Sequence, residues 1–335
     1  MITAGERVGD PVLSADVTDD HVLAIDIGGT KIAAGLVSET GEVRLEREVP
    51  TDASSAAAVG AALDGLVAAV LGEARAAGVA VVDTVGIGSA GPVDTTTGTV
   101  HPVNIVSLRG YPLVASVAAA ATAALGRPAR AVLAQDGQCF AAAEQWVGAA
   151  AGSPSMMGVV VSTGIGGGVV LDGRILAGKT GNAGFISHVG VVLDGEELKG
   201  SGARGVVEAY ASGPSMVAEA LRRGWRTGEA GVDARTLTAD AAAGDATAVA
   251  VIADGTRALA SSFLSAAALF DLSDIVVGGG VASAGAVLMD PLRAAYAELA
   301  VYPHLADVRI VRSTLPRLSG LIGAGRLGWQ HLGGA

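Results

Sequence analysis

The stretch Asp26-Ile27-Gly28-Gly29-Thr30-Lys31 lies between two apolar runs, residues 22–25 and 32–37. This order predicts a strand, a tight glycine turn and a second strand, with a carboxylate at the mouth of the hairpin. Two adjacent glycines let backbone N–H groups close on an anion without obstruction by a Cβ. Asp26 can hold a hydrated Mg²⁺ beside that anion, because Mg²⁺ prefers few carboxylates and keeps several waters. The alternative is a plain structural turn. The element is not a Walker loop, since the sequence G-x-x-x-x-G-K-[ST] does not occur.

Composition narrows the class of protein. The chain has 335 residues, of which 50% are hydrophobic and only 3% aromatic. Its core must therefore be built from Ala, Val, Leu and Ile, which is typical of closely packed α/β layers, and its length predicts two domains. The net charge of −11 argues against nucleic acid and against an anionic membrane surface as partners, because both attract basic patches.

The cysteine content and the N-terminal residues predict the cellular setting. Cys139 is the single cysteine, which excludes internal disulfides and a multi-cysteine metal site and fits a reducing, cytoplasmic location. Residues 1–20 lack the basic start and apolar segment of a secretory signal, and we expect them to form a flexible arm. No uninterrupted apolar run is long enough to span a bilayer.

Strand-like and helix-like segments alternate along most of the chain. Strands are expected over 22–27, 32–37, 42–49, 84–88, 130–134, 158–162, 168–171, 274–278 and 307–312. Helices are expected over 53–77, 112–125, 137–150, 206–223, 235–269 and 286–300. The first three strands have no helix between them, so part of a sheet must be antiparallel. The fold class is therefore α/β, with two lobes and a helical insertion in the second.

Two further glycine loops follow strands in the second half of the chain. Residues 162–168 include Thr163, Gly164 and Gly166 and join two apolar runs, so their hydroxyls and amides can grip phosphate oxygens. The alternative is an ordinary glycine-rich hairpin. Gly278, Gly279 and Gly280 end a third strand and permit close approach of a flat ligand such as adenine, or of a helix to the sheet. Neither loop is a G-x-G-x-x-G dinucleotide fingerprint.

Asp136 follows the apolar run 131–134 and Gln135, and it opens a helix. A carboxylate in this position can simply cap the helix. The functional alternative is a general base, because a sugar hydroxyl is a poor nucleophile until a positioned carboxylate accepts its proton. His188 is one of five histidines and is a modest site candidate. Glu208 opens another helix, where it can merely complement the helix dipole.

These pieces stand in a fixed order, and together they make the chain resemble the ROK sugar kinases (repressor, open reading frame, kinase) of the actin-like, ribonuclease-H-like ATPase superfamily. The resemblance covers about residues 22–328. It rests on LAIDIGGTKIAAGLV (23–37), GIGSAGPVD (86–94), HPVNIVSLRGYPL (101–113), AQDGQCFAAAE (134–144), VVVSTGIGGGVVLDGRILAG (159–178), GNAGFISHV (181–189), GVVEAYASG (205–213), DIVVGGGV (274–281) and LSGLIGAG (318–325). It implies a two-lobed actin-like ATPase fold, with a small lobe over 21–134, a large lobe over 135–317 and a C-terminal helix, 318–335, that packs back on the small lobe.

The resemblance also implies roles for individual residues. Asp136 matches the catalytic base. The nucleotide and its Mg²⁺ are assigned to three sets: Asp26, Gly28, Gly29, Thr30 and Lys31; Thr163, Gly164 and Gly166; and Gly278, Gly279 and Gly280. The resemblance implies that the sugar is bound by the residues at the following positions: Gly91, Asn104, Gln135, Asp136, Phe185, His188 and Glu208. Members of the family close two lobes over the sugar, which excludes water and limits ATP hydrolysis.

The chain departs from the family in the loop that normally binds zinc. The usual motif CxCGxxGCxE is aligned with residues 199–208, and its three cysteine positions hold Lys199, Ser201 and Val206. His188 alone cannot hold the ion, because structural zinc takes four ligands. We therefore predict that no structural zinc is bound, and that the loop is ordered by packing or by the sugar.

Two further departures lie in the sugar site. The family's GExGH is Gly184-Phe185-Ile186-Ser187-His188 here, so an acid that normally contacts the sugar is replaced by Phe185. N-acetylmannosamine kinases of this family can also lack that acid. Our hypothesis is that Phe185 lies against a bulky or acetylated substituent. The asparagine that normally precedes the base is Gln135, one methylene longer.

The favoured hypothesis is a cytoplasmic, homodimeric kinase that transfers phosphate from Mg²⁺·ATP to the 6-hydroxyl of a hexose or N-acetylhexosamine. The alternative is a sugar-sensing protein of the same fold with weak catalysis, because of the altered sugar loop. A plain nucleotide hydrolase ranks third, and a DNA-binding repressor is disfavoured by the acidic charge. Glucose, mannose, N-acetylglucosamine and N-acetylmannosamine remain open as substrates, and polyphosphate remains open as donor.

Overall fold

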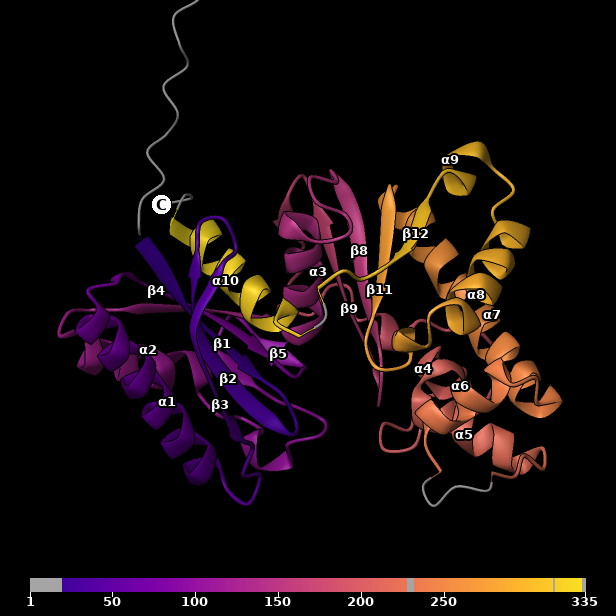
Figure 1. The fold of residues 1–335 in the computed structure, drawn as a ribbon, viewed down its shortest axis with the longest axis horizontal. Helices are drawn as coiled ribbons and strands as arrows, with labels where there is room; N and C mark the ends of the chain where they lie inside the picture. The colour runs from indigo at the N-terminus through magenta and orange to yellow at the C-terminus, as the bar shows by residue number, and fades with distance from the viewer. Residues whose placement is uncertain (1–19, 228–231, 316, 333–335) are drawn as a thin grey trace, which may run out of the picture.

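The computed structural model describes residues 20–227, 232–315 and 317–332. They form two five-stranded sheets with helices packed on both faces of each (Figure 1). The fold class predicted from the sequence, a two-lobed α/β fold of the actin-like type, is confirmed. The expected arm over residues 1–20 lies, except for Asp20, outside the described residues.

The small lobe is built on a sheet of strand order β3-β2-β1-β4-β7. β1 pairs antiparallel with β2 and parallel with β4, so the antiparallel part comes from the first three strands, as expected. The helices α1 and α2 pack against each other and cover one face. The elements are β1 (Asp20–Ile27), β2 (Lys31–Ser38), β3 (Val43–Pro50), α1 (Ala56–Ala77), β4 (Ala80–Ser89), β5 (Val93–Asp94), β6 (Thr99–Val100), α2 (Leu113–Leu125) and β7 (Arg130–Gln135).

The large lobe has a sheet of strand order β10-β9-β8-β11-β12. Its hairpin β8–β9 repeats the antiparallel arrangement of β1–β2, and β11 and β12 add in parallel. The elements are α3 (Asp136–Val147), β8 (Ser155–Val161), β9 (Ile165–Leu171), β10 (Arg174–Ile175), α4 (Glu208–Ala211), α5 (Gly213–Arg222), α6 (Ala234–Ala242), α7 (Ala246–Phe270), β11 (Asp274–Gly278), α8 (Ala286–Leu299), α9 (Pro303–Ala306) and β12 (Arg309–Arg312).

The last helix, α10 (Ser319–Leu332), returns to the small lobe. It packs on β4 and β1 on the face opposite α1 and α2, and also against α3, which lies on β8 and β9. In Figure 1 the yellow α10 and the magenta α3 stand between the two sheets. The two helices therefore form the contact between the lobes.

Two helical segments differ from the expectation. The helix expected over 206–223 is divided into α4 and α5, because Ser212 is extended and caps α5 by accepting the amide of Ser215. The helix expected over 235–269 is divided into α6 and α7, which meet at 113°. Asp245 caps α7 by accepting the amide of Ala248. Both breaks are side-chain caps that compete with a continuous helix.

Helix α1 is long and apolar enough, by length and composition, to cross a membrane. Its apolar residues have another role in this fold. Leu63, Val67 and Val70 are buried and belong to the core cluster formed with the strands of the small lobe. Packing against the sheet and α2 therefore accounts for the apolar face of the helix.

Candidate active site

The first glycine turn joins β1 to β2 at the end of the small-lobe sheet. The Gly28 amide donates to the Lys31 carbonyl at 3.0 Å, and the Thr51 hydroxyl donates to the Gly28 carbonyl at 2.8 Å. The Lys31 ammonium forms an exposed ion pair with Glu48 on β3, with an N–O distance of 2.7 Å. Gly29 and Thr30 are exposed at the tip of the turn. The turn thus has a fixed backbone and a free outer surface.

Asn104 lies against this turn. It is exposed in the loop that follows β6. A Cβ placed on Gly29 would come within 2.6 Å of the Asn104 Nδ2 atom, so a side chain there would displace the Asn104 amide. The structure thus brings a residue assigned to the sugar beside a residue assigned to the phosphates.

The second glycine loop closes the hairpin of β8 and β9. The Ser162 amide donates to the Gly164 carbonyl at 2.9 Å, which leaves Thr163 at the tip. A Cβ on Gly168 would overlap the backbone of Gln138 in α3. Because these glycines have no side chains, α3 lies directly on β9. A Cβ placed on Gly166 would lie 3.9 Å from the Asp136 Oδ1 atom, so this glycine faces the carboxylate.

The third glycine loop lies beside the second. Gly279 has a φ of +92°, and a Cβ there would overlap the Val161 carbonyl. A Cβ on Gly280 would contact the Ser162 hydroxyl at 3.4 Å. The Val281 amide donates to the Val161 carbonyl at 3.0 Å. Gly278 ends β11 against Phe140. The two loops therefore form adjoining parts of one surface at the strand ends of the large-lobe sheet.

Asp136 is the first residue of α3. Gln135 and Gln138 form a reciprocal capping box around it, which fixes the start of the helix. The Asp136 Oδ1 atom accepts the Gly137 amide at 2.7 Å. Although Asp136 is exposed, desolvation by the surrounding protein raises the pKa of its carboxyl, and the hydrogen bond from Gly137 opposes this effect. A carboxylate with a raised pKa is a stronger base, which suits proton transfer from a hydroxyl.

Asp26 is the penultimate residue of β1, and its carboxyl feels the charge of Asp136. Burial, and then the charge of Asp136, raise the pKa of Asp26 to about 7, while Lys31 lowers it. The first residues of α10 close over the carboxylate, because a Cβ on Gly320 would overlap the Asp26 Oδ2 atom. A divalent cation bound between two nearby carboxylates and an anion offsets the repulsion among these negative charges. The residues present therefore fit a hydrated Mg²⁺.

Gln135 is held by Asn182, a residue from the loop that precedes Phe185. The Gln135 Nε2 atom donates to the Asn182 Oδ1 atom at 2.7 Å. Asn182 also accepts the Val93 amide at 2.9 Å and donates to the Val93 carbonyl at 2.6 Å. A Cβ on Gly91 would lie 2.6 Å from the Gln135 Oε1 atom. Asn182 thus connects the two lobes beside Asp136, and it was not among the site residues expected from the sequence.

Phe185 and His188 are placed together by a short 3₁₀ turn, Ile186–His188. Their ring centroids are 5.0 Å apart, and the His188 Nδ1 atom is 3.0 Å from the Ser187 hydroxyl. Glu208 lies on the segment beside this turn: the preceding Val207 amide donates to the Val189 carbonyl at 2.9 Å, and the Glu208 Oε2 atom accepts the Ile165 amide at 2.6 Å. The carboxylate expected at the sugar therefore contacts the second glycine loop.

The loop that lacks the zinc cysteines is ordered by its own hydrogen bonds. It forms isolated bridges between Gly190 and Val206 and between Glu197 and Arg204. The Tyr210 hydroxyl accepts the Glu196 amide at 2.7 Å. Within the described ranges, no group of three or more His, Cys, Asp or Glu side chains is placed to hold a metal ion. The absence of structural zinc remains a prediction that metal analysis of the purified protein will test.

Comparisons with known proteins bear on this arrangement. The ROK family profile matches residues 22–330. Among curated proteins, the chain is 31% identical to the glucokinase of Streptomyces coelicolor over 321 residues, covering 91% of this chain and 96% of that protein. It is 36% identical to the N-acetylmannosamine kinase of Citrobacter koseri over 306 residues, covering 91% and 97%.

Solved structures agree with this result. A ROK hexokinase from Thermus thermophilus is 32% identical and superposes with a TM-score of 0.82, covering 94% of this chain and 100% of that one. A ROK family glucokinase from Streptomyces griseus, solved in complex with glucose and AMPPNP, is 31% identical and superposes with a TM-score of 0.74, covering 92% and 99%.

Proposed function

Because the chain belongs to the ROK family, we propose that it is an ATP- and Mg²⁺-dependent sugar kinase that phosphorylates the 6-hydroxyl of a hexose or an N-acetylhexosamine. The observation that supports this most is the position of Asp136. Its carboxylate lies at the start of α3, beside the second glycine loop and electrostatically coupled to Asp26. One carboxylate therefore adjoins both loops that are assigned to the triphosphate.

In this proposal the chain mainly binds and positions the reactants. Asp136 accepts the proton of the sugar hydroxyl, and the amides around Gly28 and Gly164 hold the triphosphate. Mg²⁺, when bound near Asp26, neutralises charge on the phosphates during transfer. The third glycine loop faces the adenine, which favours ATP over polyphosphate as donor.

We propose an N-acetylhexosamine as the preferred sugar. Phe185 offers an apolar ring, stacked at an angle of 34° on His188, at the position where the family usually has an acid. An acetyl methyl group can pack on such a ring, whereas a bare hydroxyl loses a strong acceptor. We further propose that the enzyme is a homodimer and that it works in the cytoplasm.

The experiment is an assay of Mg²⁺·ATP-dependent phosphorylation of glucose, mannose, N-acetylglucosamine and N-acetylmannosamine. We expect turnover with an N-acetyl sugar, and we expect Asp136→Asn to lower kcat by about 10²–10⁴-fold without loss of sugar binding. Full activity of Asp136→Asn would overturn the assignment of the base. A clear preference for glucose would overturn the role given to Phe185.

A sugar-sensing protein with weak catalysis is the second candidate. It is favoured by Phe185, which stands where the family usually has an acid that contacts the sugar. This candidate predicts sugar binding in calorimetry without turnover of any of the four sugars. A plain nucleotide hydrolase would instead turn over ATP at a rate independent of sugar.

A further inference from the structure

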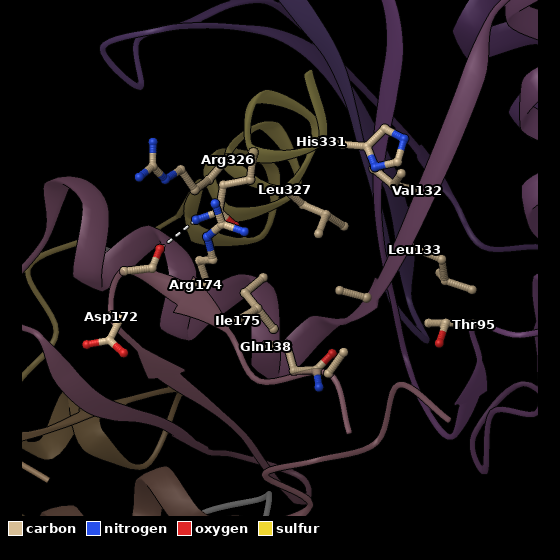
Figure 2. A pocket seen from close by; sticks show the side chains of 14 residues that line it. Thr95, Val132, Leu133, Gln138, Asp172, Arg174, Ile175, Arg326, Leu327 and His331 are labelled. Atoms are coloured by element: carbon tan, nitrogen blue, oxygen red, sulfur yellow. Dashed lines mark hydrogen bonds between the residues drawn. The ribbon is translucent and has the colours of Figure 1, made fainter. Parts of the chain in front are cut away.

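A cavity of about 480 Å³ lies at the seam between the two lobes. It is bounded by β7 and α10 on one side and by α3 and the β9–β10 hairpin on the other (Figure 2). The described residues that line it include none from the three glycine loops. It is therefore distinct from the candidate active site, although Gln138 forms part of its wall.

Two arginines line this cavity from opposite sides of the seam. Arg174 extends from β10 and Arg326 belongs to α10 (Figure 2). Among the residues with described positions, neither guanidinium forms an ion pair with a carboxylate. The Arg326 guanidinium lies 5.1 Å from the centroid of the Trp146 ring. Its Nε atom is buried without a hydrogen-bond partner in the part of the chain that the structure describes.

An unpaired, partly buried guanidinium destabilises the folded state. Burial lowers the pKa of Arg326 from its ordinary value. An anion that accepts hydrogen bonds from Arg326 and Arg174 would remove this cost. Arginine is well suited to the task, because its planar fork matches phosphate and carboxylate oxygens.

The remaining wall limits the shape and charge of the ligand. Leu133, Ile175 and Leu327 provide an apolar surface (Figure 2). Asp172 is the acid among the lining residues, and its carboxylate points away from the two guanidinium groups in this view. His331 lies near Val132, away from the arginines, and offers a further polar group.

We propose that this cavity binds a small organic anion, with its phosphate or carboxylate on Arg174 and Arg326 and a compact apolar body on Leu133, Ile175 and Leu327. Such a ligand contacts both lobes at once. The Gln330 Nε2 atom already donates to the Gly173 carbonyl across the same seam at 2.6 Å, so the ligand joins an existing contact between the lobes. The site does not depend on the proposed kinase activity.

The test is calorimetric titration of the full chain with phenyl phosphate, benzoate and inorganic phosphate, with Mg²⁺·AMPPNP and sugar present to fill the cleft. We expect phenyl phosphate or benzoate to bind, and inorganic phosphate, which lacks an apolar body, to bind at least tenfold more weakly. The stronger of the first two probes identifies the head group as phosphate or carboxylate. Equal binding of inorganic phosphate would contradict the role of the apolar wall.

Variants assign the binding to this cavity. Arg174→Gln and Arg326→Met should each weaken binding by about tenfold or more, the usual loss when a charge-assisted hydrogen bond is removed. Arg174 is exposed, so its variant should fold normally. Asp172→Asn removes the opposing acid and should tighten binding. Arg257→Gln, which removes an equal charge from an exposed position on α7, is the matched control. No binding of any probe, or equal binding by all variants, would overturn the proposal.

Discussion

At the scale of single residues, Asp26 and Asp136 determine the electrostatics of the site. Both carboxylates have a raised pKa because the surrounding protein desolvates them, although Asp26 is only half-buried and Asp136 is exposed, and the pKa of Asp26 is raised further by its neighbour. A pair of like charges in such partly desolvated surroundings destabilises the folded chain unless a cation or a proton is bound. The same arrangement prepares one carboxylate for a metal ion and the other for proton transfer.

The raised pKa of Asp26 predicts how stability depends on pH. Between its ordinary pKa of 3.8 and its folded pKa of about 7, the folded chain holds a proton that the unfolded chain has lost. The metal-free protein should therefore lose stability as pH rises through this range. Asp26→Asn should reduce this loss in the free energy of unfolding by about 1–3 kcal/mol. A tenfold change in proton affinity corresponds to about 1.4 kcal/mol, and the full shift is reduced because part of the side chain is solvated. Urea unfolding at pH 5 and pH 8 in EDTA measures it.

The control for this experiment is Asp64→Asn, which removes an exposed carboxylate from α1. It should keep the pH dependence of the parent chain. If Asp26→Asn also keeps it, Asp26 does not hold the proton.

Phe185 predicts a change of substrate preference. Phe185→Glu restores an acceptor for a sugar hydroxyl and removes the apolar ring, so the kcat/KM ratio of N-acetylhexosamine to glucose should fall at least about tenfold. Phe185→Leu keeps an apolar surface and should keep most of the preference. Steady-state kinetics on both sugars measure the ratio. An unchanged ratio in Phe185→Glu would show that this side chain does not face the discriminating substituent.

The residue scale also shows what the sequence could and could not predict. The glycine pairs and Asp136 were recognisable because a strand, a turn and an acid are local in sequence. Asn182 was missed as a site residue, because its partners Val93 and Gln135 come from other segments. The sugar assignment of Glu208 rests on a motif alone, and the structure adds a contact with Ile165 that the motif does not reveal.

At the scale of elements, the close packing of α10 on the small-lobe sheet and on α3 depends on small residues. A Cβ on Gly323 would overlap the Cys139 carbonyl, and one on Gly86 would overlap the Ala324 carbonyl. Backbone atoms cannot move aside as a flexible side chain can.

Strands and helices with strong periodicity were located well from sequence, whereas the two-residue strands β5, β6 and β10 have too few residues to give a pattern.

This packing predicts opposite effects of the same substitution at two helical glycines. Gly323→Ala should destabilise the protein by about 2–3 kcal/mol or more, because the added methyl group overpacks the contact with α3. Gly72→Ala lies in α1 with no atom within 4 Å of the new methyl group, and it should stabilise by about 0.5–1 kcal/mol. Thermal unfolding of both variants measures the difference. Equal melting temperatures would contradict the proposed contact, and a Gly323→Ala chain that cannot be purified folded would support it if Gly72→Ala is purified normally.

At the scale of the whole molecule, the lobes are joined by α3, α10 and a small number of polar contacts. Asn182 is the most connected of these contacts, since it bonds Val93 in one lobe and Gln135 at the junction. It therefore aligns the small lobe with the segment that holds Asp136. Such alignment affects catalysis even where the residue does not touch the reacting atoms.

Asn182→Ala should loosen this alignment. Loss of the three hydrogen bonds that join it to Val93 and Gln135, each worth about 0.5–1.5 kcal/mol, should raise the KM for sugar roughly tenfold, with a smaller change in kcat. Sugar titrations and small-angle scattering of the variant measure both the affinity and the closing of the lobes. An unchanged KM would show that the lobes are aligned without this residue.

The position of α10 has a consequence for how the protein is made. The inner face of the first sheet, which includes Ala24, Ala33 and Val37, is covered by the last helix of the chain. When the strand β7 leaves the ribosome, that helix has not yet been synthesised. At about 5–20 residues per second, the apolar face stays open for roughly ten seconds or more. A nascent chain in this state is a substrate for chaperones, and a message cut short before residue 319 would produce a small lobe that can never close.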